Sequence, residues 1–152
     1  MTTSPVNYIV YISNEAIHFD KKILSGILKE SREWNLAHGI TGILLYDSGN
    51  IMQVLEGEKG EVQYIYKKIE ADKRHRHITK IADDFIEERS FKDWSMAFRT
   101  ATPDFFHTLS GYTKLNADLL PDEHTANHSV LFLVKMFLAL NPSVIDPHFG
   151  RL

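Results

Sequence analysis

Apolar segments of two kinds alternate along the first part of this chain, and their order restricts the folds open to it. Short apolar runs predict strands, whereas longer stretches with apolar residues every three or four positions predict helices. Their order is strand, helix, strand, strand, helix, strand, strand. This is the order of a ferredoxin-like α/β sandwich with one added strand, an α+β fold in which two helices cover one face of a mixed five-stranded sheet.

Local signals set the expected bounds of these elements. We expect strands at residues 8–12, 42–46, 51–56, 78–87 and 94–99, and helices at 20–36 and 61–72. Asp20 is a suitable N-cap for the first helix, and Gly39 is a suitable residue for its end. The turn Asp47-Ser48-Gly49-Asn50 is typical of a hairpin between the second and third strands.

Composition narrows the class of protein. A chain of 152 residues suits one domain, and we expect no second, catalytic domain. The absence of cysteine excludes disulfides, thiolate metal sites and thiol nucleophiles. A net charge of -3 with both signs interspersed does not favour nucleic acid or a membrane surface as a partner. The N-terminus lacks the layout of a secretion signal, so we expect a cytoplasmic protein.

Polar residues end an otherwise apolar stripe of the first predicted helix. Ile27, Ser31 and Asn35 are spaced by four and therefore share one face. A stripe that begins as core and ends with a hydroxyl and an amide predicts a polar ligand edge across its C-terminal half. The alternative is that Asn35 caps the helix and Ser31 bonds to the preceding turn.

A glutamine stands inside an apolar strand. Gln53 lies among apolar residues in the predicted third strand, and Tyr11 lies among apolar residues in the first. The amide of Gln53 both donates and accepts, so it can link a phenol to a ligand. Alternatively, Gln53 satisfies backbone groups at a strand edge and Tyr11 is a core tyrosine.

These residues occur in blocks that resemble the BLUF family, small blue-light receptors that bind flavin without a covalent link. The blocks lie in order along the chain and together are specific to that family. They contain Tyr11 at 7–13, Asn35 at 34–42 and Gln53 at 52–58, and continue at 72–75 and 91–96.

The resemblance implies a flavin site, with FAD expected and FMN or riboflavin left open. The implied cofactor-binding residues are Ile27, Ser31, Asn35, Gln53, Lys68, Ile69, Asp72 and His75. Asn35 would bond the ring edge, and Ile27 and Ile69 would pack on its two faces. Asp72 and His75 match the family's ribityl and phosphate segment. Lys68 stands where relatives often have arginine, which has a geometry for phosphate that lysine lacks.

The resemblance also implies a mechanism. Excited flavin would take an electron from Tyr11, a proton would move through Gln53, and the rearranged hydrogen bonds would form the signal. Trp94 and Met96, expected on one face of the fifth strand, would pass the signal on, and the sequence does not tell which of them faces inward in the dark. A flavin-dependent oxidoreductase and a chromophore-free regulatory domain remain alternatives.

We divide the chain into a flavin-binding domain at 1–102 and a helical extension at 103–152. A short helix is expected from Thr102-Pro103-Asp104, and a longer one at 125–140. The longer helix is apolar nearly all round, so we expect it to pack on the open sheet face or at an oligomer interface. We expect a homo-oligomer with an unknown downstream protein partner. The histidines have spacings a metal could use, but no third ligand is evident, so we expect no metal site.

Overall fold

The structure is a computed structural model that describes residues 5–47, 49–91 and 95–100. Five strands and two helices follow the predicted order. The elements are β1 (Val6–Glu15), α1 (Lys21–His38), β2 (Thr41–Asp47), β3 (Asn50–Gly57), α2 (Lys59–Ala71), β4 (His75–Ile86) and β5 (Ala97–Thr100).

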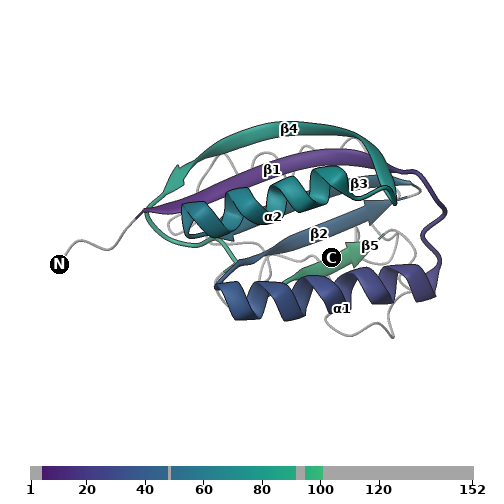
Figure 1. The fold of residues 1–152 in the computed structure, drawn as a ribbon, viewed down its shortest axis with the longest axis horizontal. Coiled ribbons are helices and arrows are strands. Elements are labelled where there is room, and N and C mark those ends of the chain that lie inside the picture. Colours follow the sequence, from purple (N-terminus) through teal and green to yellow (C-terminus); the bar gives the residue numbers. More distant parts are fainter. Residues whose placement is uncertain (1–4, 48, 92–94, 101–152) are drawn as a thin grey trace, which may run out of the picture.

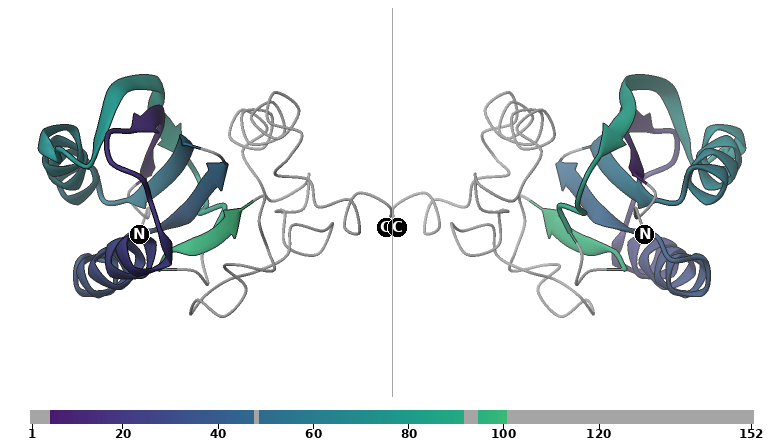
Figure 2. Two further views of the ribbon diagram at one scale, coloured as in Figure 1. Left: turned by 90° about the vertical axis from the view of Figure 1, so that its right-hand side faces the viewer. Right: turned by 90° about the vertical axis from the view of Figure 1, so that its left-hand side faces the viewer.

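The strands form one mixed sheet in the order β4-β1-β3-β2-β5. The pairs β1–β4, β1–β3 and β2–β3 are antiparallel, whereas β2–β5 is parallel. Both helices lie on the same side of the sheet, as Figure 1 and the turned views of Figure 2 show. The predicted ferredoxin-like α+β sandwich is therefore confirmed.

The ends of α1 follow the predicted caps. The side chain of Asp20 accepts a hydrogen bond from the backbone N–H of Ile23 at 2.8 Å, which satisfies one of the free donors of the first turn. At the other end Gly39 adopts a left-handed conformation with φ of 66°, which glycine adopts without steric cost. The chain can therefore turn directly from α1 into β2.

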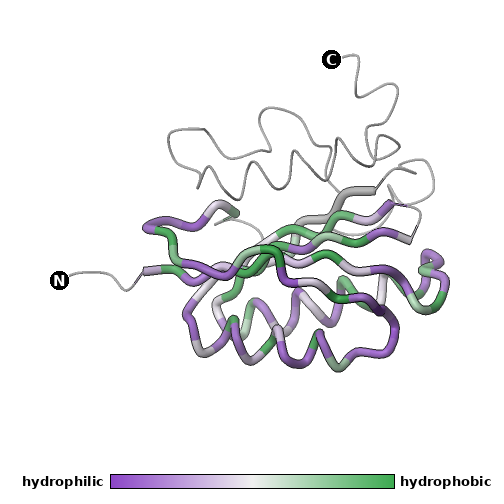
Figure 3. Tube along the Cα trace, turned by 90° about the horizontal axis from the view of Figure 1, so that it is seen from above, coloured by the Kyte–Doolittle hydropathy of each residue, from purple (hydrophilic) through white to green (hydrophobic). Residues whose placement is uncertain are grey.

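The helix α2 begins two residues earlier than predicted. Its N-cap is Glu58, whose carboxylate accepts bonds from the backbone N–H groups of Gly60 and Glu61. The helical coils carry both hydrophobic and hydrophilic residues, as expected for helices with one apolar face (Figure 3). Their apolar faces, with Leu24 and Leu28 on α1 and Val62 on α2, join Ile9 and Leu55 of the sheet in one core.

The fifth strand begins later than predicted. The described strand starts at Ala97, not at residue 94, so Met96 precedes it. The backbone carbonyls of Ser95 and Met96 accept hydrogen bonds from side chains of α1, which occupy them immediately before the ladder to β2 begins. Trp94 and the predicted extension at 103–152 lie outside the described residues.

Alternate residues of the central strands point away from the helices. Ile9 and Tyr11 belong to the core beneath the helices, so Val10 between them faces the opposite side, as does Val54 on β3. Both valines are fully buried. Neither described helix has the length and apolar composition that a membrane span requires.

Candidate functional site

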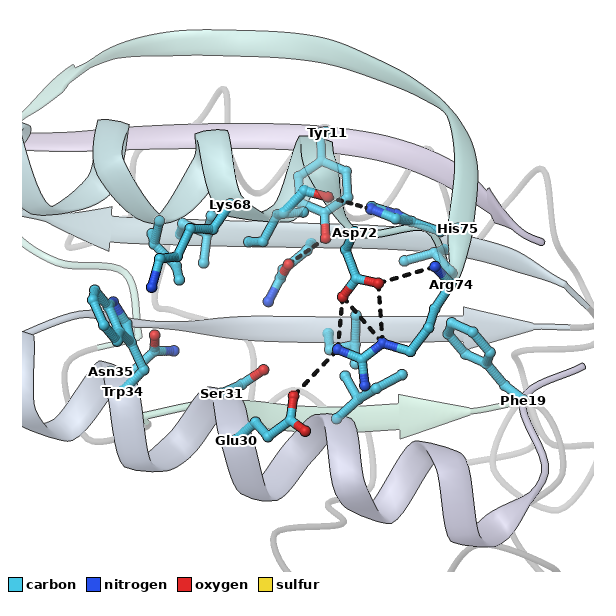
Figure 4. A pocket seen from close by; sticks show the side chains of 17 residues that line it. Tyr11, Phe19, Glu30, Ser31, Trp34, Asn35, Lys68, Asp72, Arg74 and His75 are labelled. Carbon is cyan, nitrogen blue, oxygen red and sulfur yellow. Dashed lines mark hydrogen bonds and ion pairs between the residues drawn. The ribbon is translucent and has the colours of Figure 1, made fainter. Parts of the chain in front are cut away.

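A cavity of about 270 Å³ lies between α1, α2 and the helix-facing side of the sheet (Figure 4). This volume is slightly below the range of about 300 to 1,000 Å³ that is usual for small-molecule sites. Most of its walls are apolar, and a few polar groups converge on it. It is lined by Tyr11, Phe19, Ile27, Glu30, Ser31, Trp34, Asn35, Leu44, Ile51, Gln53, Leu55, Ile65, Lys68, Ile69, Asp72, Arg74 and His75.

Tyr11 and Gln53 form the polar centre of the cavity floor. They stand opposite each other in the register of β1 and β3, and the Tyr11 hydroxyl donates a hydrogen bond to Oε1 of Gln53. Burial, followed by the nearby Tyr66 and Asp72, raises the pKa of Tyr11 above its ordinary value. Tyr11 is therefore a neutral phenol whose proton is directed at an amide oxygen.

The other end of the Gln53 amide meets Met96. Its Nε2 donates to the Met96 sulfur at 3.6 Å, and Met96 is buried. A thioether is a weak acceptor, so one end of the amide has a strong partner and the other a weak one. Sequence alone did not decide between Trp94 and Met96; in the structure Met96 faces inward beside Gln53.

Two side chains of α1 hold the segment that carries Met96. Nδ2 of Asn35 donates to the Ser95 carbonyl at 2.6 Å, and Nε of Arg32 donates to the Met96 carbonyl at 3.1 Å. Asn35 is thus not the helix cap that was one alternative, because that position belongs to Gly39. Its Oδ1 accepts no hydrogen bond from a described residue.

Unused polar atoms gather at the Asn35 end of the cavity. Nε1 of Trp34 is buried and has no hydrogen-bond partner among the described residues, and Ser31 makes no side-chain hydrogen bond to them. Trp34 and Asn35 lie together at the end opposite Phe19 (Figure 4). Because buried polar atoms are normally paired, this end of the cavity is suited to a ligand that has its own polar edge.

An ion-pair bridge at the mouth of the cavity joins α1 to the segment that follows α2. Arg74 contacts Asp72 at 2.6 Å and Glu30 at 3.2 Å, and its guanidinium extends across the opening (Figure 4). Burial tends to raise the pKa of Asp72, but hydrogen bonds from Arg74 and its charge outweigh this and lower it. Asp72 is therefore an anion with Arg74 as its partner.

His75 and Lys68 line the cavity in different ways. The ring nitrogens of His75 contact Ser13 Oγ at 2.9 Å and the Ile69 carbonyl at 2.6 Å, so both are engaged within the protein. Lys68 projects from α2, with its ammonium 4.4 Å from the Trp34 ring centroid and 5.2 Å from that of Tyr64. Both contacts are within the range of a cation–π interaction.

The structure brings all eight predicted cofactor-binding residues to this one cavity, together with Tyr11. Sequence reasoning missed Trp34, although it follows Ser31 by three positions and so shares its helix face. It also missed Glu30 and Arg74 as a bridge, because nothing in their spacing shows that they meet. Within the described residues, no group of three histidine, aspartate or glutamate side chains could hold a metal.

Chemically, the cavity is a slot with apolar walls, amide and indole groups at one end and a phenol–amide pair on its floor. It suits a flat conjugated ring with a polar edge. The sequence matches the family described as "BLUF: Sensors of blue-light using FAD" over residues 6–97.

Individual relatives agree with this match. The chain is 39% identical over 83 residues to the photoactivated adenylate cyclase subunit alpha of Euglena gracilis, a match that covers 55% of this chain and 8% of that protein. The chain thus spans less than a tenth of that relative.

Among solved structures, the dark state of the BLUF protein BlrB has a TM-score of 0.62 and 32% identity, covering 70% of this chain and 86% of BlrB. The BlsA ground state has a TM-score of 0.62 and 29% identity, covering 90% of this chain and 87% of BlsA.

Proposed function

This chain belongs to the BLUF family, the sensors of blue light that use FAD, and from that premise we propose that Tyr11 and Gln53 are the photoactive pair of a flavin-based light sensor. The observation that carries the proposal is the hydrogen bond from the Tyr11 phenol to Gln53 on the floor of the cavity. It joins a group that can lose an electron and a proton to a group that can receive the proton.

The residues around the cavity fit a flavin ring. Ile27 on α1 and Ile69 on α2 offer apolar contacts from opposite helices, as a flat ring between them requires. Oδ1 of Asn35, which lines the cavity, provides an acceptor for its polar edge. Among the described residues, the partner of Gln53 Nε2 is a thioether, so this nitrogen can donate to a better acceptor.

The charged residues at the mouth suit the chain that extends from such a ring. Ser31 offers a hydroxyl, and Lys68 a cation that can meet a phosphate. Asp72 is already paired with Arg74, so we assign it to the mouth of the site together with its partner. His75 has both nitrogens engaged, and we therefore assign it a packing role beside Tyr11, whose ring centroid is 6.0 Å away.

When bound, a flavin excited by blue light supplies a strong one-electron oxidant at this position. Tyr11 is the donor. A phenol that loses an electron becomes strongly acidic, so its proton passes along the existing hydrogen bond to Oε1 of Gln53. Nε2 of Gln53 would then release one proton to the flavin that has taken the electron, which leaves the side chain as its imidic acid tautomer, free to rotate. The electron and one proton would return from the flavin to Tyr11, so that only the hydrogen bonds of Gln53 differ from those in the dark.

The change at Gln53 reaches the protein through Met96. Met96 contacts Gln53 and directly precedes β5, so a new orientation of the amide alters the packing of the segment leading into the sheet edge. We propose that the signal continues to the extension at 103–152, and that this extension covers the sheet face opposite the helices. The buried Val10 and Val54 on that face support a covering layer.

We propose that the light signal leaves this domain through protein contacts, with no substrate turnover by the domain. We also propose that the protein is a homo-oligomer. We do not assign the cyclase activity of the Euglena relative to this chain, because the match covers only 8% of that protein. The proposed partner is a protein that recognises the altered extension or sheet edge.

Absorption spectra of the flavin-loaded protein, in the dark and after blue light, test this function. We expect a small, reversible red shift in the parent protein. Tyr11→Phe should bind flavin but lose the shift, because the ring remains while the transferable electron and proton are gone. Tyr46→Phe is the matched control, since Tyr46 is a buried tyrosine that does not line the cavity. A normal shift in Tyr11→Phe would refute the assigned role of Tyr11.

A further inference from the structure

Glu56 is a fully buried carboxylate near the end of β3, three residues after Gln53. It does not line the cavity, and its neighbour Leu55 belongs to the core beneath the helices. By strand alternation Glu56 therefore points to the other face of the sheet. A buried carboxylate is costly unless hydrogen bonds compensate, so its partners indicate what it is for.

Both carboxylate oxygens of Glu56 accept hydrogen bonds from the chain between β4 and β5. The backbone N–H of Ser90 donates to Oε2 at 2.8 Å, and that of Phe91 donates to Oε1 at 2.6 Å. The hydroxyl of Thr41, opposite Glu56 on β2, donates to Oε1 at 2.8 Å. Two successive backbone donors directed at one carboxylate are a strong, charge-assisted contact.

Arg89 completes this contact without a direct bond to the carboxylate. Its Nη1 donates to the Thr41 hydroxyl at 3.1 Å and to the backbone carbonyl of Glu56 at 3.3 Å. Burial raises the pKa of Glu56, although the bonds from Ser90, Phe91 and Thr41 and the charge of Arg89 oppose it. The strand β3 is thus joined to residues 89–91 by several coordinated hydrogen bonds.

These contacts fix one end of the path that leads to Met96. Phe91 is buried and lies five residues before Met96. The carbonyls of Ser95 and Met96 are held from α1 by Asn35 and Arg32. The chain entering the site is therefore held by β3 at residues 90–91 and by α1 at residues 95–96. One strand, β3, carries both Gln53 and the group that holds the start of this path.

We propose that Glu56 is a positioning residue of the light response, which holds residues 90–91 so that Met96 is presented to Gln53. The inference rests on the function proposed above. Glu56 acts through the backbone of residues 90–91, without contact to the cavity. Its removal should therefore alter how fast the switched hydrogen bonds of Gln53 return to their dark arrangement, and should leave flavin binding in place.

Glu56→Gln tests this proposal in the full-length, flavin-loaded protein. The amide keeps one acceptor oxygen but places an NH₂ group against a backbone N–H, so one of the two backbone bonds is lost. We expect the rate of dark recovery after blue light to change by about two- to tenfold, the effect of one lost hydrogen bond. Asn7→Ala is the control, because Asn7 is a buried polar residue whose side chain contacts Asp83, Asp84 and Gln63 at the β1–β4 side.

The outcomes distinguish a positioning role of Glu56 from a purely structural one. A changed rate of dark recovery in Glu56→Gln supports the positioning role if Asn7→Ala, with its melting temperature lowered by the same amount, recovers at the parent rate. A parent-like rate in Glu56→Gln overturns it and leaves Glu56 a purely structural residue. If Glu56→Gln fails to fold, Thr41→Val decides in the same way, because it removes only one of the donors. A flavin-loaded parent without any light-induced shift contradicts the proposed function itself.

Discussion

Tyr11 and Gln53 face each other across β1 and β3, and the Tyr11 phenol donates a hydrogen bond to the Gln53 side-chain oxygen. Within the part of the chain that the structure describes, the opposite end of the same amide donates to the sulfur of Met96. A side chain with a strong partner at one end and a weak partner at the other has two distinct arrangements. This asymmetry makes Gln53 a suitable switch between two hydrogen-bond networks.

Asn35→Ala should weaken flavin binding. The substitution removes the acceptor assigned to the ring edge and also the donor to the Ser95 carbonyl. Losing a hydrogen bond in a buried site costs about 1 to 3 kcal/mol, equivalent to roughly a 5- to 150-fold rise in Kd. Titration of the apoprotein with FAD measures this change in Kd. Leu36→Ala, at an exposed position of the same helix, is the control. Equal FAD affinity in Asn35→Ala and the parent would limit Asn35 to holding Ser95.

Met96→Ala should uncouple the site from the sheet edge. We expect light-dependent changes of hydrogen exchange at residues 95–100 in the parent and much smaller changes in this variant, because the side chain in contact with Gln53 is gone. Met96→Leu keeps a similar volume at little cost in stability and should retain most of the change. Hydrogen exchange that is identical in dark and light in the parent would rule out this route.

Stability should fall at alkaline pH in a way that depends on Tyr11. Burial raises the pKa of Tyr11 above its ordinary value of 10.0. Above that pH the unfolded chain releases this proton while the folded chain retains it, so the free energy of unfolding decreases as pH rises. Urea unfolding between about pH 9 and pH 11 should therefore show a steeper loss in the parent than in Tyr11→Phe. Parallel pH profiles would show that Tyr11 titrates normally in the folded protein.

Sequence patterns predicted most of this fold because its elements end at strong local signals. Asp20 and Gly39 bound α1 as expected, and Asp47 and Asn50 flank the turn between β2 and β3. The predicted start of β5 was wrong. Strand propensity favours a strand through Met96, but the backbone carbonyls of Ser95 and Met96 accept hydrogen bonds from side chains of α1 instead. That competition comes from tertiary contacts, which no local pattern contains.

The residues of the site likewise fall into those that local patterns predicted and those that only tertiary contacts reveal. Ile27, Ser31 and Asn35 were predicted from helical spacing and family resemblance, and they line the cavity. The bridge from Arg74 to Glu30 joins residues 44 positions apart, and the contacts of Glu56 with residues 90 and 91 are similarly distant. Single-sequence patterns report local neighbours, so such pairings appear only in the folded chain.

Infrared difference spectroscopy of protein with isotope-labelled glutamine measures the proposed hydrogen-bond switch at Gln53 directly. The chain has only two glutamines, Gln53 and Gln63. Gln63 lies outside the cavity and bonds to Asn7 and Asp83, so Gln63→Met leaves Gln53 as the sole labelled residue. Label-sensitive amide bands are expected in the light-minus-dark spectrum of Gln63→Met and should vanish in Gln53→Leu. A reversible flavin shift without any label-sensitive band in Gln63→Met would contradict the proposed switch.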